Sequence, residues 1–295
     1  MNGDAARITV AEMVADATAR LAGENIESAR LDAELLLADS FGRSRTWLFT
    51  RLAERVPPEV ASRFMVYVER RLSHEPVAYI LGRKEFMSID FEVNRHVLIP
   101  RPETESIVQT ALDFLADLDH DQHVIDLCTG SGCIAVAMAV HERRCTVSAS
   151  DISDTAIDVA RRNAVRAGVS DRVRFSKGDT YAAFVDGPPP GGVDAVVSNP
   201  PYVALHEMEM LPAEVSAYEP RQALEAGEDG LDIVRRVIDG AVEWLRPGGL
   251  LAVETAFRQV PVAMLYAKRT GRFRDVAGVY MMGGGECGIK AILKT

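Results

Sequence analysis

Apolar positions in the first quarter of the chain recur with the three- to four-residue spacing of amphipathic helices. A helix is predicted to begin at the capping box Thr9–Glu12, a second to cover residues 28–40, and a third to follow Pro57 and Pro58. A short helix is expected around Trp47. We therefore predict a small helical bundle over residues 1–73, which suits either structural packing or a platform for a macromolecular substrate.

From Pro76 the spacing changes to a near-alternation of aromatic and β-branched residues, which is typical of strands. The apolar positions of these runs are Val77, Tyr79, Ile80, Phe86, Ile89, Phe91 and Val93. Gly82 and Asn94 bound the second run. We predict a β-hairpin linker over residues 74–98.

Short apolar runs alternate with helical patterns over residues 99–295, which is typical of β-α-β units around a mainly parallel sheet. Strands are predicted at 124–127, 146–150, 173–177, 193–197 and 250–254, with a final antiparallel pair near 276–280 and 289–293. Helices are predicted over 103–115, 134–140 and 230–245. The predicted fold class is α/β, a Rossmann-like sheet preceded by the helical bundle and the hairpin.

A glycine turn at residues 128–132 joins the first of these strands to an apolar helix. Such a turn lets a nucleotide approach main-chain N–H groups at a helix start. The pattern G-x-G-x-x-G is absent because residue 135 is alanine, which disfavours NAD and FAD. Asp151 ends the next strand, at the position where such folds bind ribose hydroxyls; the structural alternative is a surface aspartate that caps the helix after Ser153.

A stiff elbow, Ser198-Asn199-Pro200-Pro201-Tyr202, follows the fourth predicted strand. The prolines fix φ and supply no N–H. The carbonyl oxygens of the elbow are therefore not expected to be hydrogen-bonded within a β-sheet. The Asn199 side chain adds an acceptor and Tyr202 an aromatic face. Acceptors beside a flat ring suit a planar –NH₂ group, as required for transfer to an amide or exocyclic amine nitrogen. The structural alternative is a plain Asn-Pro turn.

Composition restricts the class of protein further. The chain has 295 residues, a hydrophobic fraction of 47% and a net charge of −10, which argues against general attraction to nucleic acid. The four cysteines form neither a disulfide framework nor a metal-ligand pattern, so no metal is predicted. The first four residues do not resemble a secretory leader and no run of 18 apolar residues follows, so a cytoplasmic protein is expected.

Together these motifs make the chain similar to the class I S-adenosylmethionine-dependent methyltransferases, and within them to the protein-glutamine methyltransferases that modify release factors. Besides the glycine turn and the elbow, the resemblance is carried by segments 28–34 (SARLDAE), 79–82 (YILG), 85–86 (EF), 99–105 (IPRPETE), 218–220 (YEP), 223–224 (AL) and 229–231 (DGL). Residues 127–133 and 211–214 also resemble the sister family that methylates a glutamine of a ribosomal protein.

The resemblance implies a role for each motif residue. S-adenosylmethionine would be held by Cys128, Thr129, Gly130, Ser131, Gly132, Asp151, Thr180 and Asn199. Asn199, Pro200, Pro201 and Tyr202 would bind the target glutamine, with Asn199, Pro200 and Tyr202 carrying catalysis. The implied substrate is the Gly-Gly-Gln loop of a peptide chain release factor. A ribosomal protein is the alternative, and an exocyclic amine of nucleic acid is a weaker one. The enzyme is expected to act as a monomer, without a stable nucleic-acid or membrane partner.

Overall fold

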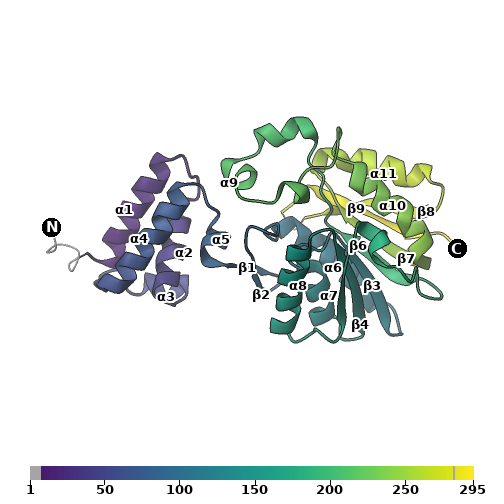
Figure 1. Cartoon of the computed structure of the whole chain (residues 1–295), viewed down its shortest axis with the longest axis horizontal. Helices are drawn as coiled ribbons and strands as arrows, with labels where there is room; N and C mark the ends of the chain where they lie inside the picture. The colour runs from purple at the N-terminus through teal and green to yellow at the C-terminus, as the bar shows by residue number, and fades with distance from the viewer. Residues whose placement is uncertain (1–7, 282) are drawn as a thin grey trace. The chain divides into compact units, whose positions relative to one another are not determined.

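A computed structural model describes residues 8–281 and 283–295, so the expectation for the first four residues lies outside the described residues. The chain divides into two compact units (Figure 1). The first contains the chain up to Gly82 together with Pro212–Tyr218, and the second contains Arg83–Leu211 and Glu219–Thr295.

The helices predicted before residue 73 lie in the first unit, which continues beyond that residue to Gly82. Its helices are α1 (Val10–Gly23), α2 (Ala29–Ser40), α3 (Arg45–Phe49), α4 (Pro58–Leu72), α5 (Val77–Leu81) and α9 (Ala213–Ser216). The Thr9–Glu12 capping box opens α1 as expected, because the Thr9 hydroxyl accepts from the Glu12 N–H and the Glu12 carboxylate accepts from the Thr9 N–H. Leucines and valines of α1, α2 and α4 share one core with Phe64.

A buried ion pair lies inside this bundle and explains part of the SARLDAE segment. The Arg71 guanidinium donates to Asp32 at 2.8 Å, and both side chains are less than a tenth exposed. Arg71 also pairs with Glu214 at 2.9 Å, and the Tyr218 hydroxyl donates to the Ser73 carbonyl at 2.7 Å. These contacts attach segment 212–218 to the helical unit.

The strand predicted at Val77–Ile80 is wrong, because this run is the short helix α5. Pro76 precedes its first turn, and Gly82 ends it with a φ of 71°. Ile80 is buried in the core of the bundle, so tertiary packing decides a run too short for its periodicity to distinguish helix from strand. The hairpin itself is present, as β1 (Arg83–Phe86) and β2 (Ile89–Glu92).

The second unit contains a seven-stranded sheet in the order β5-β4-β3-β6-β7-β9-β8. Its strands are β3 (Gln122–Leu127), β4 (Cys145–Asp151), β5 (Val173–Lys177), β6 (Val193–Ser198), β7 (Leu245–Glu254), β8 (Phe273–Tyr280) and β9 (Glu286–Leu293). The pairs from β5 to β7 are parallel, and β9 is antiparallel to both β7 and β8. The α/β fold class and the antiparallel closing pair are confirmed.

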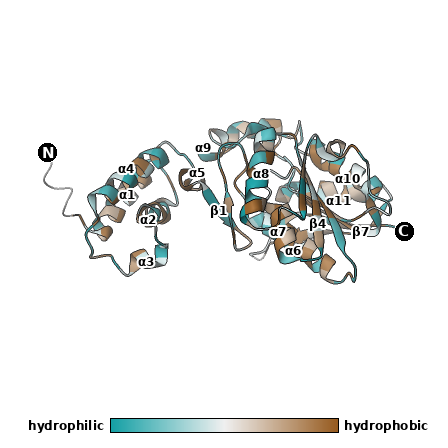
Figure 2. Cartoon of the chain, turned by 60° about the horizontal axis from the view of Figure 1, so that its bottom comes forward, coloured by the Kyte–Doolittle hydropathy of each residue, from teal (hydrophilic) through white to brown (hydrophobic). Residues whose placement is uncertain are grey.

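Helices cover both faces of this sheet. The helices α6 (Pro102–Ala116), α7 (Cys133–His141) and α8 (Asp154–Arg166) pack on one core, whereas α10 (Asp232–Trp244) and α11 (Val260–Arg269) pack on another. Figure 2 shows α7 mainly in brown, because its side chains are predominantly apolar, whereas α8 alternates between teal and brown. Short 3₁₀ turns lie at Thr180–Ala183, Leu205–Met210, Arg221–Ala223 and Phe257–Gln259.

The region around Pro247 differs from the prediction. The predicted helix end at Leu245 and strand start at Leu250 are replaced by a strand that already begins at Leu245. Leu245 pairs with Val193, and a register shift then accommodates the Pro-Gly-Gly step before Leu250 pairs with Ala195. A further helix, α11, was not predicted; Ala263 and Ala267 lie on its buried side.

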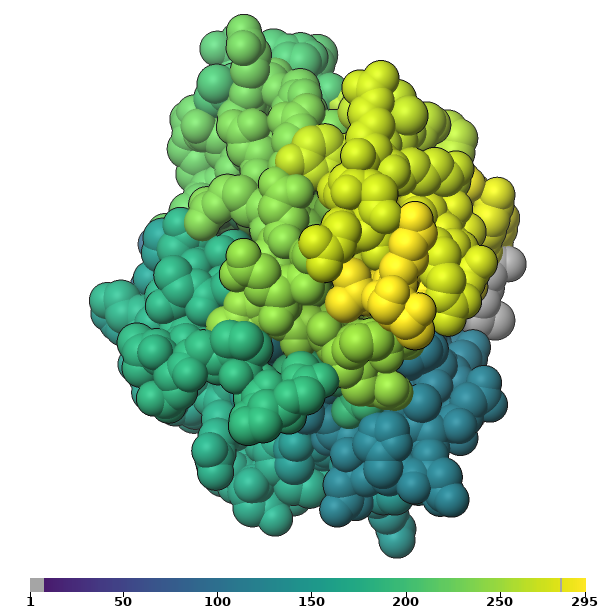
Figure 3. All heavy atoms as spheres, turned by 90° about the vertical axis from the view of Figure 1, so that its right-hand side faces the viewer, coloured from purple at the N-terminus to yellow at the C-terminus, as the bar shows by residue number. Residues whose placement is uncertain are grey.

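The end of the chain packs into the surface of the second unit. Figure 3 shows the last residues, in orange-yellow, lying against the yellow-green atoms of the preceding segments. The Lys294 N–H donates to the Arg272 carbonyl at 2.9 Å. Over residues 8–281 and 283–295, no helix combines the length and apolar character needed to cross a bilayer.

Candidate active site at the switch point of the sheet

The chain reverses its direction of strand addition between β3 and β6, which are adjacent although β4 and β5 separate them in sequence. Open α/β sheets bind ligands beyond the carboxyl ends of the strands at such a point. A cavity of about 760 Å³ lies there. Its wall includes Cys128, Thr129, Gly130, Ser131, Asp151, Thr180, Asn199 and Pro201. The fold thus brings together most of the predicted site residues, whereas Gly132, Pro200 and Tyr202 are not part of the wall.

The two glycines of the turn serve different purposes. Gly130 has a φ of 54°, and a Cβ added to it would meet no atom within 4 Å. Gly132 has a φ of 80°, and a Cβ there would lie 2.9 Å from the Cβ of Ala160 on α8. Gly130 therefore keeps the cavity open, and Gly132 permits close packing of the turn against α8.

Asp151 fastens the glycine turn to the end of β4. One carboxylate oxygen accepts from the Gly130 N–H at 2.9 Å, and the other accepts from the Ser153 N–H at 2.9 Å. Burial raises the pKa of Asp151, and these main-chain hydrogen bonds oppose that effect. Because a carboxylate has about four acceptor positions, Asp151 can still accept from a ligand in the cavity. The Ser153 hydroxyl, rather than Asp151, caps α8.

Asp126 lies beneath the same turn and was not singled out in the sequence. Its Oδ2 accepts from the Thr129 hydroxyl at 2.5 Å and from the Ala135 N–H at 3.1 Å. Complete burial raises the pKa of the Asp126 carboxyl to about 7, although both hydrogen bonds act to lower it. An acidic residue inside an otherwise apolar strand, directly before a glycine turn, was the signal available for finding it.

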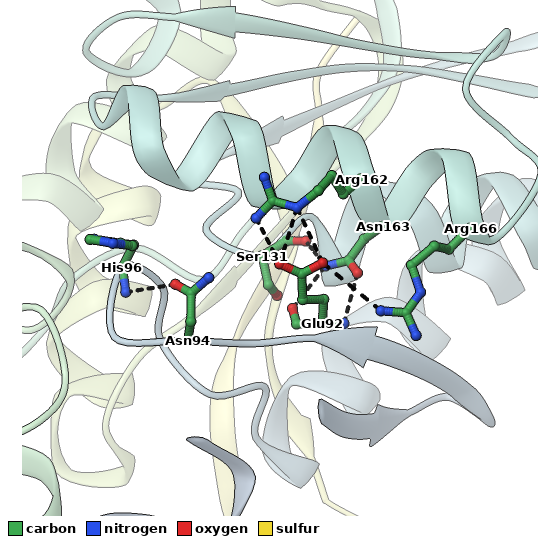
Figure 4. Close-up of polar contacts among 7 residues, drawn as sticks. All are labelled: Glu92, Asn94, His96, Ser131, Arg162, Asn163 and Arg166. Carbon is green, nitrogen blue, oxygen red and sulfur yellow. Dashed lines mark hydrogen bonds and ion pairs between the residues drawn. The ribbon is translucent and has the colours of Figure 1, made fainter. Parts of the chain in front are cut away.

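Asn163 of α8 connects the turn to the hairpin (Figure 4). Its Nδ2 donates to the Ser131 carbonyl at 2.9 Å and to the Glu92 carbonyl at 3.0 Å, and its Oδ1 accepts from the Glu92 N–H at 2.7 Å. The Arg162 guanidinium pairs with the Glu92 carboxylate beside it at 2.7 Å. Asn163 was also missed, because a polar residue on a helix has no sequence signal that reveals partners on two other segments.

The cavity also reaches the carboxyl end of β5. Thr180 has a φ of 51°, and its carbonyl accepts from the Ser150 hydroxyl at 3.1 Å. Arg236 of α10 pairs with Asp179 at 2.7 Å, and it lines the cavity together with Asp179 and Thr180. This end of the cavity therefore contains both a cation and a carboxylate.

The Asn199 elbow is held by a buried hydrogen-bond network. The Asn199 Nδ2 donates to the Thr104 hydroxyl at 3.1 Å, and that hydroxyl donates to Glu254 Oε2 at 2.6 Å. The Tyr202 hydroxyl donates to Glu254 Oε1 at 3.2 Å. Thr104 and Glu254 come from α6 and the end of β7, so three distant segments meet at the elbow.

Burial raises the pKa of the Glu254 carboxyl to about 7, although the hydrogen bonds from Thr104 and Tyr202 act to lower it. Burial, and then the Glu254 charge, raise the pKa of the Tyr202 phenol. Tyr202 lines a smaller hollow of about 220 Å³, together with Met210 and Arg258. Tyr202 therefore lies beside the main cavity rather than in its wall.

Three further residues connect the segments around the elbow. The Gln259 Nε2 donates to the Tyr202 carbonyl at 2.8 Å and to the Asp229 carbonyl at 3.1 Å. Arg101 donates to Glu219 at 2.5 Å, so its charge is already paired within this unit. Glu105 accepts from the Met87 N–H at 2.8 Å and thereby connects α6 to the hairpin.

The cavity fits a nucleoside ligand by its size and by its wall. Ligand pockets commonly measure about 300–1,000 Å³, and the observed volume lies within that range. The Gly130 position leaves space where any other residue would place a side chain. Ser131 Oγ is buried in the wall and has no hydrogen-bond partner among the described residues. In the same part of the chain, no three His, Cys, Asp or Glu residues are grouped as metal ligands.

The fold and the site together define an α/β methyltransferase. The protein-family model described as "Methyltransferase small domain" matches residues 108–277 of this sequence. The solved structure of the hMettl16 catalytic domain, in complex with MAT2A 3'UTR hairpin 1, shares this fold with a TM-score of 0.56. It is 15% identical to this chain, and the match covers 80% of each.

A second model, described as "PrmC N-terminal domain", matches residues 12–82. The release factor glutamine methyltransferase of Moorella thermoacetica is 40% identical over 270 residues, which is 91% of this chain and 93% of the relative. The corresponding Streptomyces coelicolor protein is 42% identical over 248 residues, or 83% and 84% of the two chains. The chain belongs to the release factor glutamine methyltransferase family, so the resemblance found in its sequence is confirmed.

Proposed function

We propose that this enzyme transfers a methyl group from S-adenosylmethionine to the side-chain amide nitrogen of a glutamine in a peptide chain release factor. The family membership supports the reaction class, and the curated relatives carry that substrate in their names. The observation that carries the proposal is the hydrogen bond from Asn199 Nδ2 to Thr104, which leaves the Asn199 side-chain oxygen available as an acceptor at the cavity.

The cavity residues divide into two groups under this proposal. The turn residues Cys128–Gly132 would hold the methionine part of the methyl donor, Asp151 the ribose hydroxyls, and Thr180 the neighbourhood of the adenine. Gly130 contributes an open main-chain surface, and Asp151 contributes free acceptor positions. Bound there, S-adenosylmethionine supplies an electrophilic methyl group on a positively charged sulfur.

The elbow would compensate for the weak nucleophilicity of the glutamine amide nitrogen. An amide nitrogen is a weak nucleophile, because its lone pair is delocalised into the carbonyl. If the Asn199 oxygen and the Pro200 carbonyl accept its two hydrogens, the amide would be held with its lone pair directed at the methyl group. The N–C bond would form as the S–C bond breaks, and one of the two hydrogens would then leave the nitrogen as a proton to water. Positioning of this kind contributes about 7–11 kcal/mol to lowering a barrier. Pro201 stiffens the elbow, and the Tyr202 hydroxyl supports it from behind by donating to Glu254.

The helical unit would act as the platform that holds the release factor. A free amide would need no separate domain, whereas a folded protein must be held while one side chain enters the cavity. Glycines beside the target glutamine would allow its backbone to approach the Pro200 carbonyl closely.

The test is methyl transfer from labelled S-adenosylmethionine to a purified bacterial release factor. The expected result is one methyl group on the glutamine of the Gly-Gly-Gln loop, located by mass spectrometry of the digested product. A release factor with that glutamine changed to alanine is the control and should remain unlabelled. Labelling of a ribosomal protein with no labelling of the release factor would reject the proposed substrate while keeping the chemistry.

A further inference from the structure

We infer that Thr104 and Glu254 are positioning residues for methyl transfer: the ionised Glu254 carboxylate orients the Thr104 hydroxyl, and that hydroxyl fixes which end of the Asn199 amide faces the substrate. The inference rests on the role proposed above for Asn199. It adds two residues, on α6 and β7, that lie far in sequence from the elbow.

The direction of each hydrogen bond follows from counting hydrogens. A threonine hydroxyl has a single hydrogen. When Glu254 is ionised it can only accept, so the 2.6 Å contact to Glu254 Oε2 uses this hydrogen and Thr104 Oγ1 accepts from Asn199 at 3.1 Å. Only the –NH₂ end of the Asn199 amide can donate. The opposite amide orientation would direct two oxygen atoms with lone pairs at each other, so the network presents the carbonyl oxygen to the cavity.

Burial makes this orientation strict. Thr104 and Glu254 are each 1% exposed, so water is a poor replacement for a lost partner, although Thr104 borders the cavity. Leaving a buried polar group unsatisfied is costly enough to favour one amide orientation by at least about fivefold. Tyr202 donates to the other oxygen of Glu254 and thereby holds the carboxylate in place.

The ionisation state of Glu254 would control which end of the Asn199 amide faces the cavity. Arg101 and Glu103 act on Glu254 with opposite charges, Tyr202 donates to it, and the thiols of Cys133 and Cys287 also lie within its electrostatic reach. A protonated Glu254 could donate to Thr104 Oγ1. The Thr104 hydroxyl could then donate to Asn199, and the Asn199 amide would turn so that its oxygen faces Thr104. Burial raises the pKa of Glu254 to about 7, so the orienting form is lost below that pH. Turnover should therefore rise with pH through about 7.

The test compares Thr104→Val, Thr104→Ser and Glu254→Gln in the full chain, with turnover measured at saturating substrate across about pH 6–8. Thr104→Val keeps the side-chain volume but removes the hydroxyl. It should lower turnover about 10- to 100-fold at the upper pH and abolish the rise through pH 7, while calorimetry finds an unchanged Kd for S-adenosylmethionine. Thr104→Ser should restore most of the loss together with the pH dependence. Glu254→Gln should also lack the rise.

Thr110→Val is the matched control. Thr110 lies on the same helix, and its hydroxyl donates to the Ser106 carbonyl at 2.8 Å, away from the site. Its turnover and pH profile should match the parent enzyme.

Two outcomes would overturn the inference. One is a Thr104→Val enzyme that keeps both its turnover and its rise through pH 7. The other is a loss of turnover that Thr104→Ser does not restore and that accompanies an equal loss of cofactor affinity and thermal stability. The Asn199→Ala enzyme distinguishes the proposed role of Asn199 from the positioning role of Thr104 and Glu254. If this enzyme keeps its turnover, the proposed role of Asn199 fails. If it is inactive while Thr104→Val behaves like the parent, only the present inference fails.

Discussion

The carboxylate of Asp151 accepts a hydrogen bond from the main-chain N–H of Gly130 at 2.9 Å, across 21 positions of the chain. The acidic residue at the end of β4 thus shapes the glycine turn as well as facing the cavity. A substitution at Asp151 consequently affects the turn and the ligand together.

Asp151→Ala is expected to weaken S-adenosylmethionine binding by about 1.5–3 kcal/mol, because a charge-assisted hydrogen bond to the ligand is lost. Calorimetry measures the change in affinity. Asp154→Ala removes a carboxylate three positions later that is exposed and paired with Lys177, and it should leave the affinity unchanged. An unchanged affinity in Asp151→Ala would refute the assignment of ribose binding.

Asn199→Ala is expected to abolish turnover while the Kd for S-adenosylmethionine changes little. Alanine cannot accept an amide hydrogen, so the loss should fall on the rate constant at saturating substrate. Rapid-quench measurement of methyl transfer, with calorimetry on the same preparation, separates the two quantities. Near-parental turnover would show that the elbow is only structural.

Gly130→Ala and Gly132→Ala should fail in different ways. The Gly132 methyl would lie 2.9 Å from the Ala160 Cβ, so this variant should lose about 1–3 kcal/mol of unfolding free energy through overpacking. The Gly130 methyl meets no protein atom within 4 Å, so its stability cost is limited to backbone strain at a φ of 54° and its main effect should be reduced cofactor affinity. Urea unfolding and calorimetry on both variants test this; a reversed pattern would contradict the structure.

Asp126 should make stability depend on pH. Its pKa is raised from an ordinary value of 3.8 to about 7 by burial, so the unfolded chain releases this proton at lower pH than the folded one. The contribution of Asp126 is therefore complete below about pH 4 and is lost as pH rises to about 7, with a slope approaching 1.4 kcal/mol per pH unit. Asp126→Asn should show a smaller decrease in Tm between about pH 5 and 7 than the parent. Asp121→Asn, at an exposed position, should keep the parental decrease.

The Asp32–Arg71 pair should contribute strongly to the unfolding free energy of the helical unit. Removing one partner leaves an uncompensated buried charge, so Arg71→Met is expected to lower the unfolding free energy of that unit by about 3–5 kcal/mol. Trp47 fluorescence in a Trp244→Phe background reports unfolding of this unit, because Trp47 packs on its core. Glu54→Gln breaks an ion pair whose side chains are both exposed and should cost less than about 0.5 kcal/mol. Equal effects of the two changes would contradict the buried pair.

The sequence by itself determined most of the helices and strands of the second unit and the order of the site motifs along the chain. Turn glycines, strand-length apolar runs and the Asn199 elbow are local signals, because each depends on a backbone requirement of a few adjacent residues. They were sufficient to predict the α/β class, the parallel strands and the family. They also identified Asp151, because its spacing from the turn reflects one β-α-β unit.

Only the tertiary structure decided which side chains support those motifs. Thr104, Asn163, Glu254 and Gln259 act through partners between 30 and 150 positions away, and no local pattern contains such a distance. The helix at Val77–Leu81 was decided in the same way, by burial of Ile80 in the bundle core rather than by its alternation. A short run is compatible with either period, and the free energy of burying its apolar side selects one of them.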